Sequence, residues 1–167
     1  MKHAAFAVLT ALAITGCDSA NHAGARPAVT AISMEQYECF WGTCPHYRIE
    51  LRNDGSAIYT GIAVVQKPGT VALRPGTDAF RSVASELERI GFFQLQPTYR
   101  SQADGCASIL SDQSAVTFSA TRGGKTKTIF LSYGCQGLDA AEDLAELARV
   151  VDRQAGLAPL LGRGSPL

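Results

Sequence analysis

Five cysteines are the residues of this 167-residue chain that offer the widest range of chemistry. A cysteine can carry a lipid, bind a metal, perform redox catalysis or form a disulfide. Cys17 closes the segment Ile14-Thr15-Gly16-Cys17 near the start of the chain, whereas the other four lie at positions 39, 44, 106 and 135. The two groups therefore need separate explanations.

The first sixteen residues are typical of a secretory signal that ends at a lipidation site. Lys2 begins a short basic segment, and the eleven residues 4–14 form an apolar run. Eleven residues rise only about 16 Å as a helix, roughly half of a bilayer core, so this run is too short to span a membrane. Residues 14–17 resemble the bacterial lipoprotein box, which implies a diacylglyceryl group on the Cys17 thiol, cleavage before Cys17 and acylation of its new amine. The alternative is an ordinary secretory signal that contains a cysteine.

Lipidation at Cys17 would fix the location of the mature protein. Three acyl chains at about 0.8 kcal/mol per buried CH₂ give effectively permanent membrane attachment. Asp18 resembles an inner-membrane retention signal of enterobacterial lipoproteins, but that rule varies between bacteria, so the choice of inner or outer membrane stays open. Residues 17–28 are small and polar, which is typical of a tether. We therefore expect one domain on residues 29–155, lipid-anchored in the cell envelope and facing the periplasm. A flexible tail on residues 156–167 follows it, although Leu160 and Leu161 could dock on the domain.

The four remaining cysteines are an even number in an oxidising compartment, which favours disulfides. Of the three possible connectivities, we favour Cys39 with Cys44 and Cys106 with Cys135. The first pair flanks only four residues, and the second can close a long loop against the end of a hairpin. On the loop-entropy model, rings of six and thirty residues stabilise by roughly 2 and 3.5 kcal/mol. Both bridges are predicted to be structural.

Redox and metal chemistry are the alternatives for these cysteines. A thiol–disulfide oxidoreductase favours two cysteines that are separated by two residues at a helix N-terminus. Cys39 and Cys44 have four residues between them and lead into a predicted strand. His46 could join them in a metal site, but its separation from Cys44 matches no zinc pattern and exported thiols oxidise. We therefore expect no metal and no other cofactor.

Acid–base catalysis has few candidate residues. His46 opens a strand and His22 lies in the tether. Asp104 and Asp112 could act as acid and base, but both lie in a turn-rich loop, where aspartate is favoured for local backbone hydrogen bonds. We therefore expect no catalytic residues and predict a non-catalytic binding or structural module of the envelope. A periplasmic enzyme or a thiol–disulfide redox factor is the alternative.

The charge balance and two aromatic residues bear on the partner. Fifteen basic and fifteen acidic residues cancel, so the chain has no net charge with which to attract nucleic acid. Phe40 and Trp41 are adjacent within the first predicted disulfide loop. One interpretation is that one ring plugs the end of the sheet. The other is that the exposed ring anchors an unknown envelope protein, ligand or lipid surface, because aromatic residues dominate binding hot spots.

Two hairpins must position these residues. Apolar residues alternate before and after the turn at residues 53–55, which predicts a hairpin with Leu51 opposite Ala57. A second hairpin turns at residues 123–124, where two glycines pair Phe118 with Ile129.

Two helices accompany the hairpins, because apolar residues recur at helical spacing in two segments. Their predicted starts and stops are Thr77 or Asp78 and Gly91 for the first helix, and a capping box of Asp139 and Glu142 with a final Gly156 for the second. The order of strands, helix, hairpin and helix predicts an α+β fold. We expect an antiparallel sheet of two hairpins, stapled by disulfides, with two helices packed on one face.

Short motifs in the folded part form a recognisable set. They are the segment Cys39-Phe40-Trp41-Gly42-Thr43-Cys44-Pro45-His46-Tyr47, the turn Asn53-Asp54-Gly55, and the segments Tyr59-Thr60-Gly61, Gly91-Phe92-Phe93 and Gly134-Cys135. Together they resemble a bacterial envelope family, domain of unknown function DUF6438, over much of the mature chain. The chain departs from the family pattern by one extra residue between the first two cysteines, Trp41. The resemblance implies a fold and an envelope location but no activity.

Overall fold

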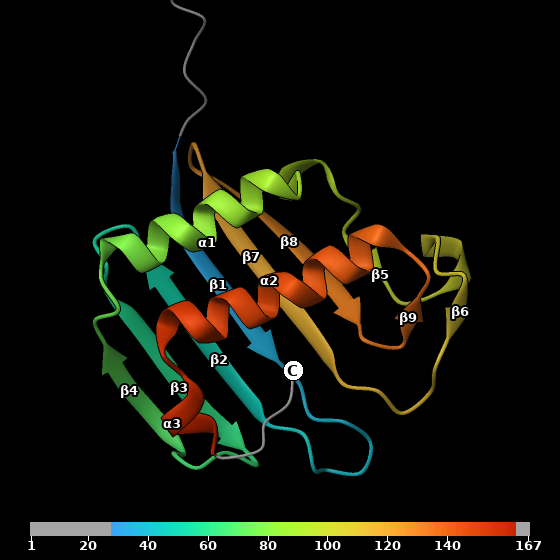
Figure 1. Cartoon of the computed structure of the whole chain (residues 1–167), viewed down its shortest axis with the longest axis horizontal. Helices are drawn as coiled ribbons and strands as arrows, with labels where there is room; N and C mark the ends of the chain where they lie inside the picture. Colours follow the sequence, from blue (N-terminus) through green and yellow to red (C-terminus); the bar gives the residue numbers. More distant parts are fainter. Residues whose placement is uncertain (1–27, 163–167) are drawn as a thin grey trace, which may run out of the picture.

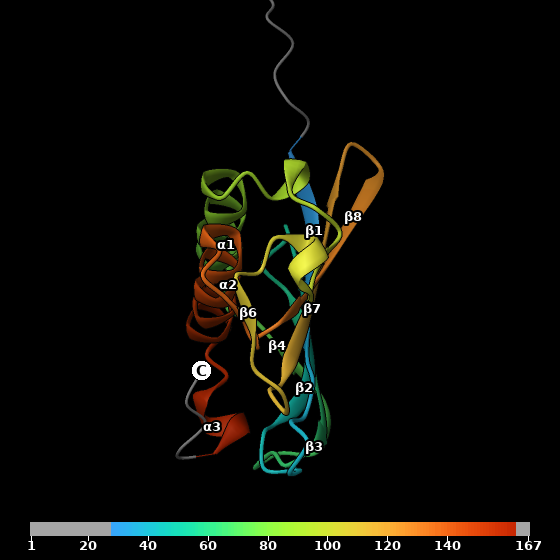
Figure 2. The ribbon, with the colours of Figure 1, turned by 90° about the vertical axis from the view of Figure 1, so that its right-hand side faces the viewer.

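The computed structural model describes residues 28–162, in which a sheet forms one layer and two long helices form the other (Figures 1 and 2). The predicted signal peptide, the lipidation site Cys17 and His22 lie outside the described residues. Residues 163–167 of the predicted tail lie outside them as well.

The strands, helices and 3₁₀ turns have the following bounds. The strands are β1 (Val29–Gln36), β2 (His46–Arg52), β3 (Ala57–Ala63), β4 (Gly69–Leu73), β5 (Thr98–Tyr99), β6 (Ser108–Ile109), β7 (Ala115–Arg122), β8 (Lys125–Ser132) and β9 (Cys135–Gln136). The helices are α1 (Thr77–Arg89), α2 (Asp139–Ala155) and α3 (Ala158–Leu161), and the 3₁₀ turns are η1 (Phe92–Gln94) and η2 (Gln102–Asp104).

The main sheet has seven strands in the order β4-β3-β2-β1-β7-β8-β5, and β6 pairs with β9 in a separate small ribbon. All neighbours in the main sheet are antiparallel except β5 and β8. The mixed α+β class predicted from the sequence is therefore confirmed. The sheet is larger than two hairpins, because β1, β4 and β5 add to the hairpins β2–β3 and β7–β8.

The central strand β1 joins the two hairpins and was not predicted. It pairs with β2 on one side and β7 on the other. Ile32, Met34 and Gln36 face the helices and are buried, whereas the residues between them face the opposite side of the sheet. The alternation is weak in the sequence because the outward residues include the small Ala31 and Ser33, and one inward residue is a glutamine.

The register of the hairpins follows from their turns. Leu51 lies opposite Ala57 in the first hairpin, and Phe118 lies opposite Ile129 in the second. These are the registers that the turn spacing favours, and they place the large apolar side chains on the face that the helices cover.

Both long helices lie on the same side of the sheet (Figure 2). The core between the two layers is apolar and includes Ile32 and Met34 of β1, Ile49 and Leu51 of β2, Phe118 of β7, Ile129 of β8, Phe80, Val83 and Leu87 of α1, and Leu144, Leu147 and Val151 of α2. Burial of these side chains supplies the main favourable free energy of folding.

The predicted N-caps are wrong, although the predicted helix stops are correct. The residue before α1 is Gly76 and the residue before α2 is Leu138, and neither helix has a side-chain cap hydrogen bond. Asp78 and Asp139 instead lie in the first turns, where a negative charge favours the helix dipole. Gly91 and Gly156 follow the helices in the left-handed conformation, with φ of 64° and 68°.

The same correction applies to Thr77 and Glu142. Thr77 is the first residue of α1, and Glu142 lies in the first turn of α2. Neither side chain therefore stands at the position from which a capping residue reaches the free N–H groups.

The predicted flexible tail is wrong over its first residues. Leu157 is fully buried, α3 follows it, and Leu161 is also buried. The backbone N–H of Lys67 donates a hydrogen bond to the carbonyl of Leu160 over 2.9 Å. The left-handed turn at Gly156 redirects the chain onto the core, so the folded domain extends beyond residue 155.

Gly61 allows β3 and the segment before β4 to approach each other closely. A β-carbon at this position would lie 2.2 Å from the backbone carbonyl oxygen of Lys67. We predict that Gly61→Ala lowers the free energy of unfolding by about 1 to 3 kcal/mol, because backbone must move to relieve the contact. Urea denaturation of the purified protein measures the loss.

Gly69→Ala is the matched control for this prediction. A β-carbon at Gly69 meets nothing within 4 Å, but φ is 85°, so the substitution carries only the conformational cost of about 1 kcal/mol. A Gly61→Ala protein as stable as the wild type, or more stable than Gly69→Ala, would contradict the prediction.

Candidate functional site

A loop closed by a disulfide joins β1 to β2. Cys39 and Cys44 are bonded to each other, with their Cα atoms 5.3 Å apart. The backbone N–H of Gly42 donates to the carbonyl of Cys39 over 2.9 Å, and the φ of Gly42 is 63°. The loop is thus a short turn with a covalent closure, and it joins one of the two cysteine pairs favoured from the sequence.

Phe40 and Trp41 at the tip of this loop both face solvent. Their side chains are 74% and 76% exposed, and the rings pack edge to face with centroids 5.3 Å apart. The interpretation that one ring plugs the end of the sheet is therefore wrong. The inner positions at this end are already filled by Gln36 and Tyr47, both buried. Two adjacent exposed aromatic rings form the kind of patch that marks an interaction surface.

A charged cluster lies at the base of the loop. Glu35 accepts hydrogen bonds from His46 Nε2 over 3.1 Å and from the Arg48 guanidinium over 2.5 Å. Partial burial raises the pKa of Glu35, but the hydrogen bonds from Arg48 and His46 outweigh it and hold the pKa below its usual range. The His46 ring also packs against Tyr37 in a tilted arrangement, with centroids 5.4 Å apart. The side chain of His46 is thus engaged with Glu35 and Tyr37.

Asp104 and Asp112 make local contacts in their loop. Asp104 accepts hydrogen bonds from the Ser101 hydroxyl over 2.8 Å and from the backbone N–H of Arg100 over 3.0 Å, and these bonds lower its pKa. Asp112 has a φ of 63° and accepts a bond from the Ser111 hydroxyl. These contacts are the turn roles that the sequence favours for both residues. Within residues 28–162, no three His, Cys, Asp or Glu side chains gather as a metal site would require.

The second disulfide joins Cys106 to Cys135, with their Cα atoms 5.2 Å apart. Both cysteines are buried, and they fasten the loop that contains η2 and β6 to the chain after β8. This is the second pair favoured from the sequence. The loop exposes Ile109 and Leu110 on its outer side.

A carboxyl group between α2 and the sheet was not predicted from the sequence. The Tyr47 hydroxyl donates to Asp152 and lies 2.6 Å from Oδ1 and 2.8 Å from Oδ2. Burial raises the pKa of Asp152 to about 7, and the bond from Tyr47 offsets only part of this effect. The one signal in the sequence is position: Asp152 follows Ala148 by four residues and so borders the apolar stripe of the helix.

Polar groups continue from this carboxyl group toward the aromatic loop. Tyr59 stacks on Tyr47, and its buried hydroxyl has no hydrogen-bond partner among the described residues. Buried Gln36 accepts a bond from the Tyr133 hydroxyl over 2.9 Å and donates to the Ser114 hydroxyl over 3.3 Å. Gln36 also lies opposite Tyr47 in the sheet. The polar contacts thus converge where β1 and β2 meet the loop.

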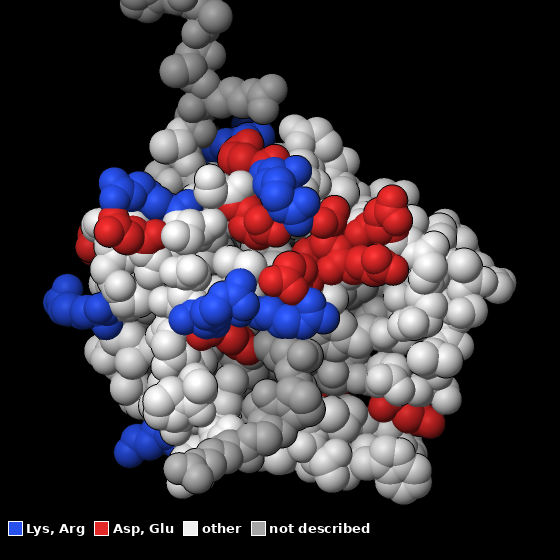
Figure 3. All heavy atoms as spheres, in the orientation of Figure 1, with Lys and Arg blue, Asp and Glu red and all other residues white. Residues whose placement is uncertain are grey.

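Charges on the helix side of the molecule alternate in sign. Figure 3 shows acidic and basic side chains interspersed over both long helices. Arg89 of α1 contacts Glu86 on its own helix and Asp143 of α2, each over 2.7 Å. Exposed pairs of this kind contribute little to stability. This face therefore offers no field of one sign to attract a polyanion.

The comparison with known families matches residues 30–155 to the family described as domain of unknown function DUF6438. The match covers well over half of the chain. The chain belongs to this family. No curated protein matches it. The DUF6438 domain begins at the second residue of β1 and ends at the last residue of α2, so it contains both disulfides, the aromatic loop and Asp152, but not α3.

We predict that Asp152 makes the stability of the DUF6438 domain depend on pH. Its folded pKa of about 7 lies above the usual 3.8, so between these pH values the folded state holds more protons than the unfolded state. Stability should therefore fall as pH rises from about 4 to 7 and then level off. Asp152→Asn keeps an acceptor for Tyr47 and removes the titration. Its melting temperature should exceed that of the wild type by about 4 °C or more at pH 8, but not at pH 4.

Thermal melts of wild type and variant between pH 4 and pH 8 test this prediction. Asp139→Asn, which removes an exposed carboxylate from the first turn of the same helix, should keep the wild-type dependence on pH. A wild-type pH slope in Asp152→Asn would show that this carboxyl group does not cause the effect.

Proposed function

We propose that the chain is a lipoprotein of the bacterial envelope, anchored through Cys17 and facing the periplasm, and that its DUF6438 domain is a non-catalytic module that binds an envelope protein. The observation that carries the proposal is the exposure of both Phe40 and Trp41 on one closed loop. Burying two such rings in a partner would remove a large apolar surface from contact with water. Aromatic residues are also enriched among the residues that dominate binding.

The closure of the loop supports a binding role. The bond between Cys39 and Cys44 and the short turn at Gly42 limit the conformations of the two rings before any partner arrives. A loop that is already ordered loses less conformational entropy on association, and more of the contact energy then appears as affinity.

The position of the loop supports a protein partner over the membrane of attachment. The predicted tether precedes Val29 at one end of β1, and the loop follows Gln36 at the other end (Figure 1). Eight strand residues separate these ends by roughly 25 Å. A domain held near Val29 thus presents Phe40 and Trp41 on the side away from its attachment. Among the described residues, no helix has the length and apolar character needed to cross a membrane.

We predict that Cys17→Ser removes the protein from the membrane. Without the thiol the acyl groups have no attachment site, and the apolar run of residues 4–14 is too short to span a bilayer. Detergent-phase partitioning of cell extracts measures the anchor, and Cys39→Ser with Cys44→Ser is the control that should still partition. Continued partitioning of Cys17→Ser would reveal a different anchor and refute the lipoprotein assignment.

We predict that Trp41→Ala leaves the free energy of unfolding unchanged within about 0.5 kcal/mol, because the side chain is mostly exposed in the folded protein and makes few contacts that unfolding would break. A melting curve tests this prediction, and a loss of about 3 to 5 kcal/mol would be expected only if the ring were in the core.

A photoreactive phenylalanine at position 41 should form a discrete protein adduct in cells. The same probe at position 110, an exposed leucine on the other disulfide loop, is the control. Lipid adducts alone at position 41 would contradict a protein partner.

A further inference from the structure

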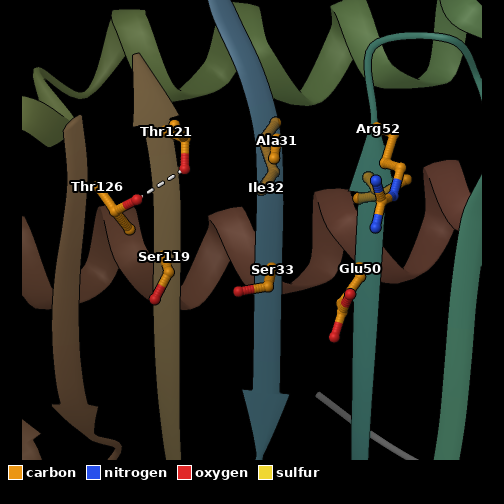
Figure 4. A pocket seen from close by; sticks show the side chains of 9 residues that line it. Ala31, Ile32, Ser33, Glu50, Arg52, Ser119, Thr121 and Thr126 are labelled. Atoms are coloured by element: carbon orange, nitrogen blue, oxygen red, sulfur yellow. Dashed lines mark hydrogen bonds between the residues drawn. The ribbon is translucent and has the colours of Figure 1, made fainter. Parts of the chain in front are cut away.

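The face of the sheet opposite the long helices (Figure 2) carries two hollows along β1, and Figure 4 shows the side chains that line one of them. One hollow of about 240 Å³ lies around Ala31 and Ser33, and a second of about 250 Å³ lies around Glu35. The two hollows share Ser33, Glu50 and Ser119, so they form one groove that follows the strand. We call it the β1 groove.

The register of the sheet builds the β1 groove in three rows. Ala31 lies between Arg52 and Thr121, Ser33 lies between Glu50 and Ser119, and Glu35 lies between Arg48 and Thr117. Small side chains of β1 form the floor in the first two rows. Longer side chains of β2 form one wall, and the hydroxyl groups of β7 form the other (Figure 4).

The hydroxyl wall is held in place before any ligand binds. Ser119 and Thr128 share a hydrogen bond over 2.9 Å, and Thr121 and Thr126 share one over 2.8 Å. A hydroxyl group offers one donor and two acceptor positions, so each keeps capacity for a ligand. Fixed groups also lose less entropy on binding than mobile ones.

The charges that line the β1 groove cancel. The lining holds two carboxylates, Glu35 and Glu50, and two guanidinium groups, and Glu35 is already paired with Arg48. A polyanion would gain nothing from such a lining, whereas a neutral ligand with many hydroxyl groups would find both donors and acceptors. The chemistry of the groove therefore fits a carbohydrate.

An extended peptide fits the β1 groove less well. Peptides that bind sheets add a strand at a free edge and use its unpaired backbone groups. β1 is paired on both sides, with β2 and with β7, so it has no free edge. Recognition in this groove must use side chains, and these are mostly hydroxyl, carboxylate and guanidinium groups.

Aromatic rings lie at one end of the β1 groove. Two residues beyond Glu35, Tyr37 packs against the tilted ring of His46, and the loop with Phe40 and Trp41 follows. From Ala31 to Tyr37 the strand direction covers roughly 20 Å, enough for a short run of pyranose rings. Aromatic faces suit the apolar faces of such rings, so the groove combines a polar track with a stacking platform at its end.

We infer that the β1 groove binds an uncharged polysaccharide of linked pyranose rings. We assign this polymer to the cell envelope, and that assignment rests on the location given in the proposed function. The binding itself rests on the groove alone and is independent of both Cys17 and the protein partner.

The test is calorimetric titration of the purified full chain in detergent with a hexamer of N-acetylglucosamine as the probe. Saturable binding with a Kd of about 1 mM or tighter is expected for an open groove of this kind. Ser33→Phe fills the floor and should weaken binding at least about tenfold. Ala72→Phe places the same ring on the same open face, on β4 and outside the groove, and should bind like the wild type. Melting curves establish that each variant is folded.

A second variant tests the polar wall without adding bulk. Glu50→Gln combined with Arg52→Gln should also weaken binding about tenfold, because both side chains line the groove. Absence of binding to the hexamer, or full affinity in folded Ser33→Phe, would overturn the inference. Equal or tighter binding of a sulfated oligosaccharide would also overturn it, because the groove would then select charge. Since no membrane or protein partner is present, these outcomes are separate from failure of the proposed function.

Discussion

The backbone pairing of β1 with two neighbours at once is the interaction on which the rest of the structure depends. In the main sheet, β1 joins the half formed by β2, β3 and β4 to the half formed by β7, β8 and β5. Its inner side chains, Ile32 and Met34, lie under the helices, and its outer side chains, Ala31 and Ser33, form the floor of the β1 groove. A one-residue slip of this strand would exchange the two sets and remove both the core contacts and the groove.

The difference between β1 and the other elements explains how much of the fold the sequence predicts. The hairpin turns at residues 53–55 and 123–124 and the helix stops at Gly91 and Gly156 depend on the conformational freedom of single glycines, which is a local property. β1 depends on two partners that are distant in sequence, and its own pattern is diluted by small residues. The predicted N-caps were wrong because an acidic residue in the first turn of a helix interacts favourably with the helix dipole without serving as a cap.

In the candidate site, too, the features that depend on local sequence were predicted and those that depend on distant contacts were not. Cysteine spacing was enough to favour the two bonded pairs, since a loop of four residues brings Cys39 near Cys44 whatever the fold. The exposure of both Phe40 and Trp41 was not predictable, because it depends on Gln36 and Tyr47 occupying the inner positions at that end of the sheet. The role of Asp152 depends on a contact across 105 positions of the chain, and no local pattern reports it.

The polar contacts inside the core bear directly on the aromatic loop. Gln36 ends β1 and Tyr47 lies at the start of β2, so these two buried residues flank the loop and face each other in the sheet. Each is held by a directional hydrogen bond, Gln36 by Tyr133 and Tyr47 by Asp152. Apolar side chains at positions 36 and 47 would make no such bonds, and their contacts would tolerate small rotations of the strand ends. Hydrogen bonds, in contrast, weaken steeply when their geometry changes. We therefore interpret the raised pKa of Asp152 as the cost of fixing the direction in which the loop presents its two rings.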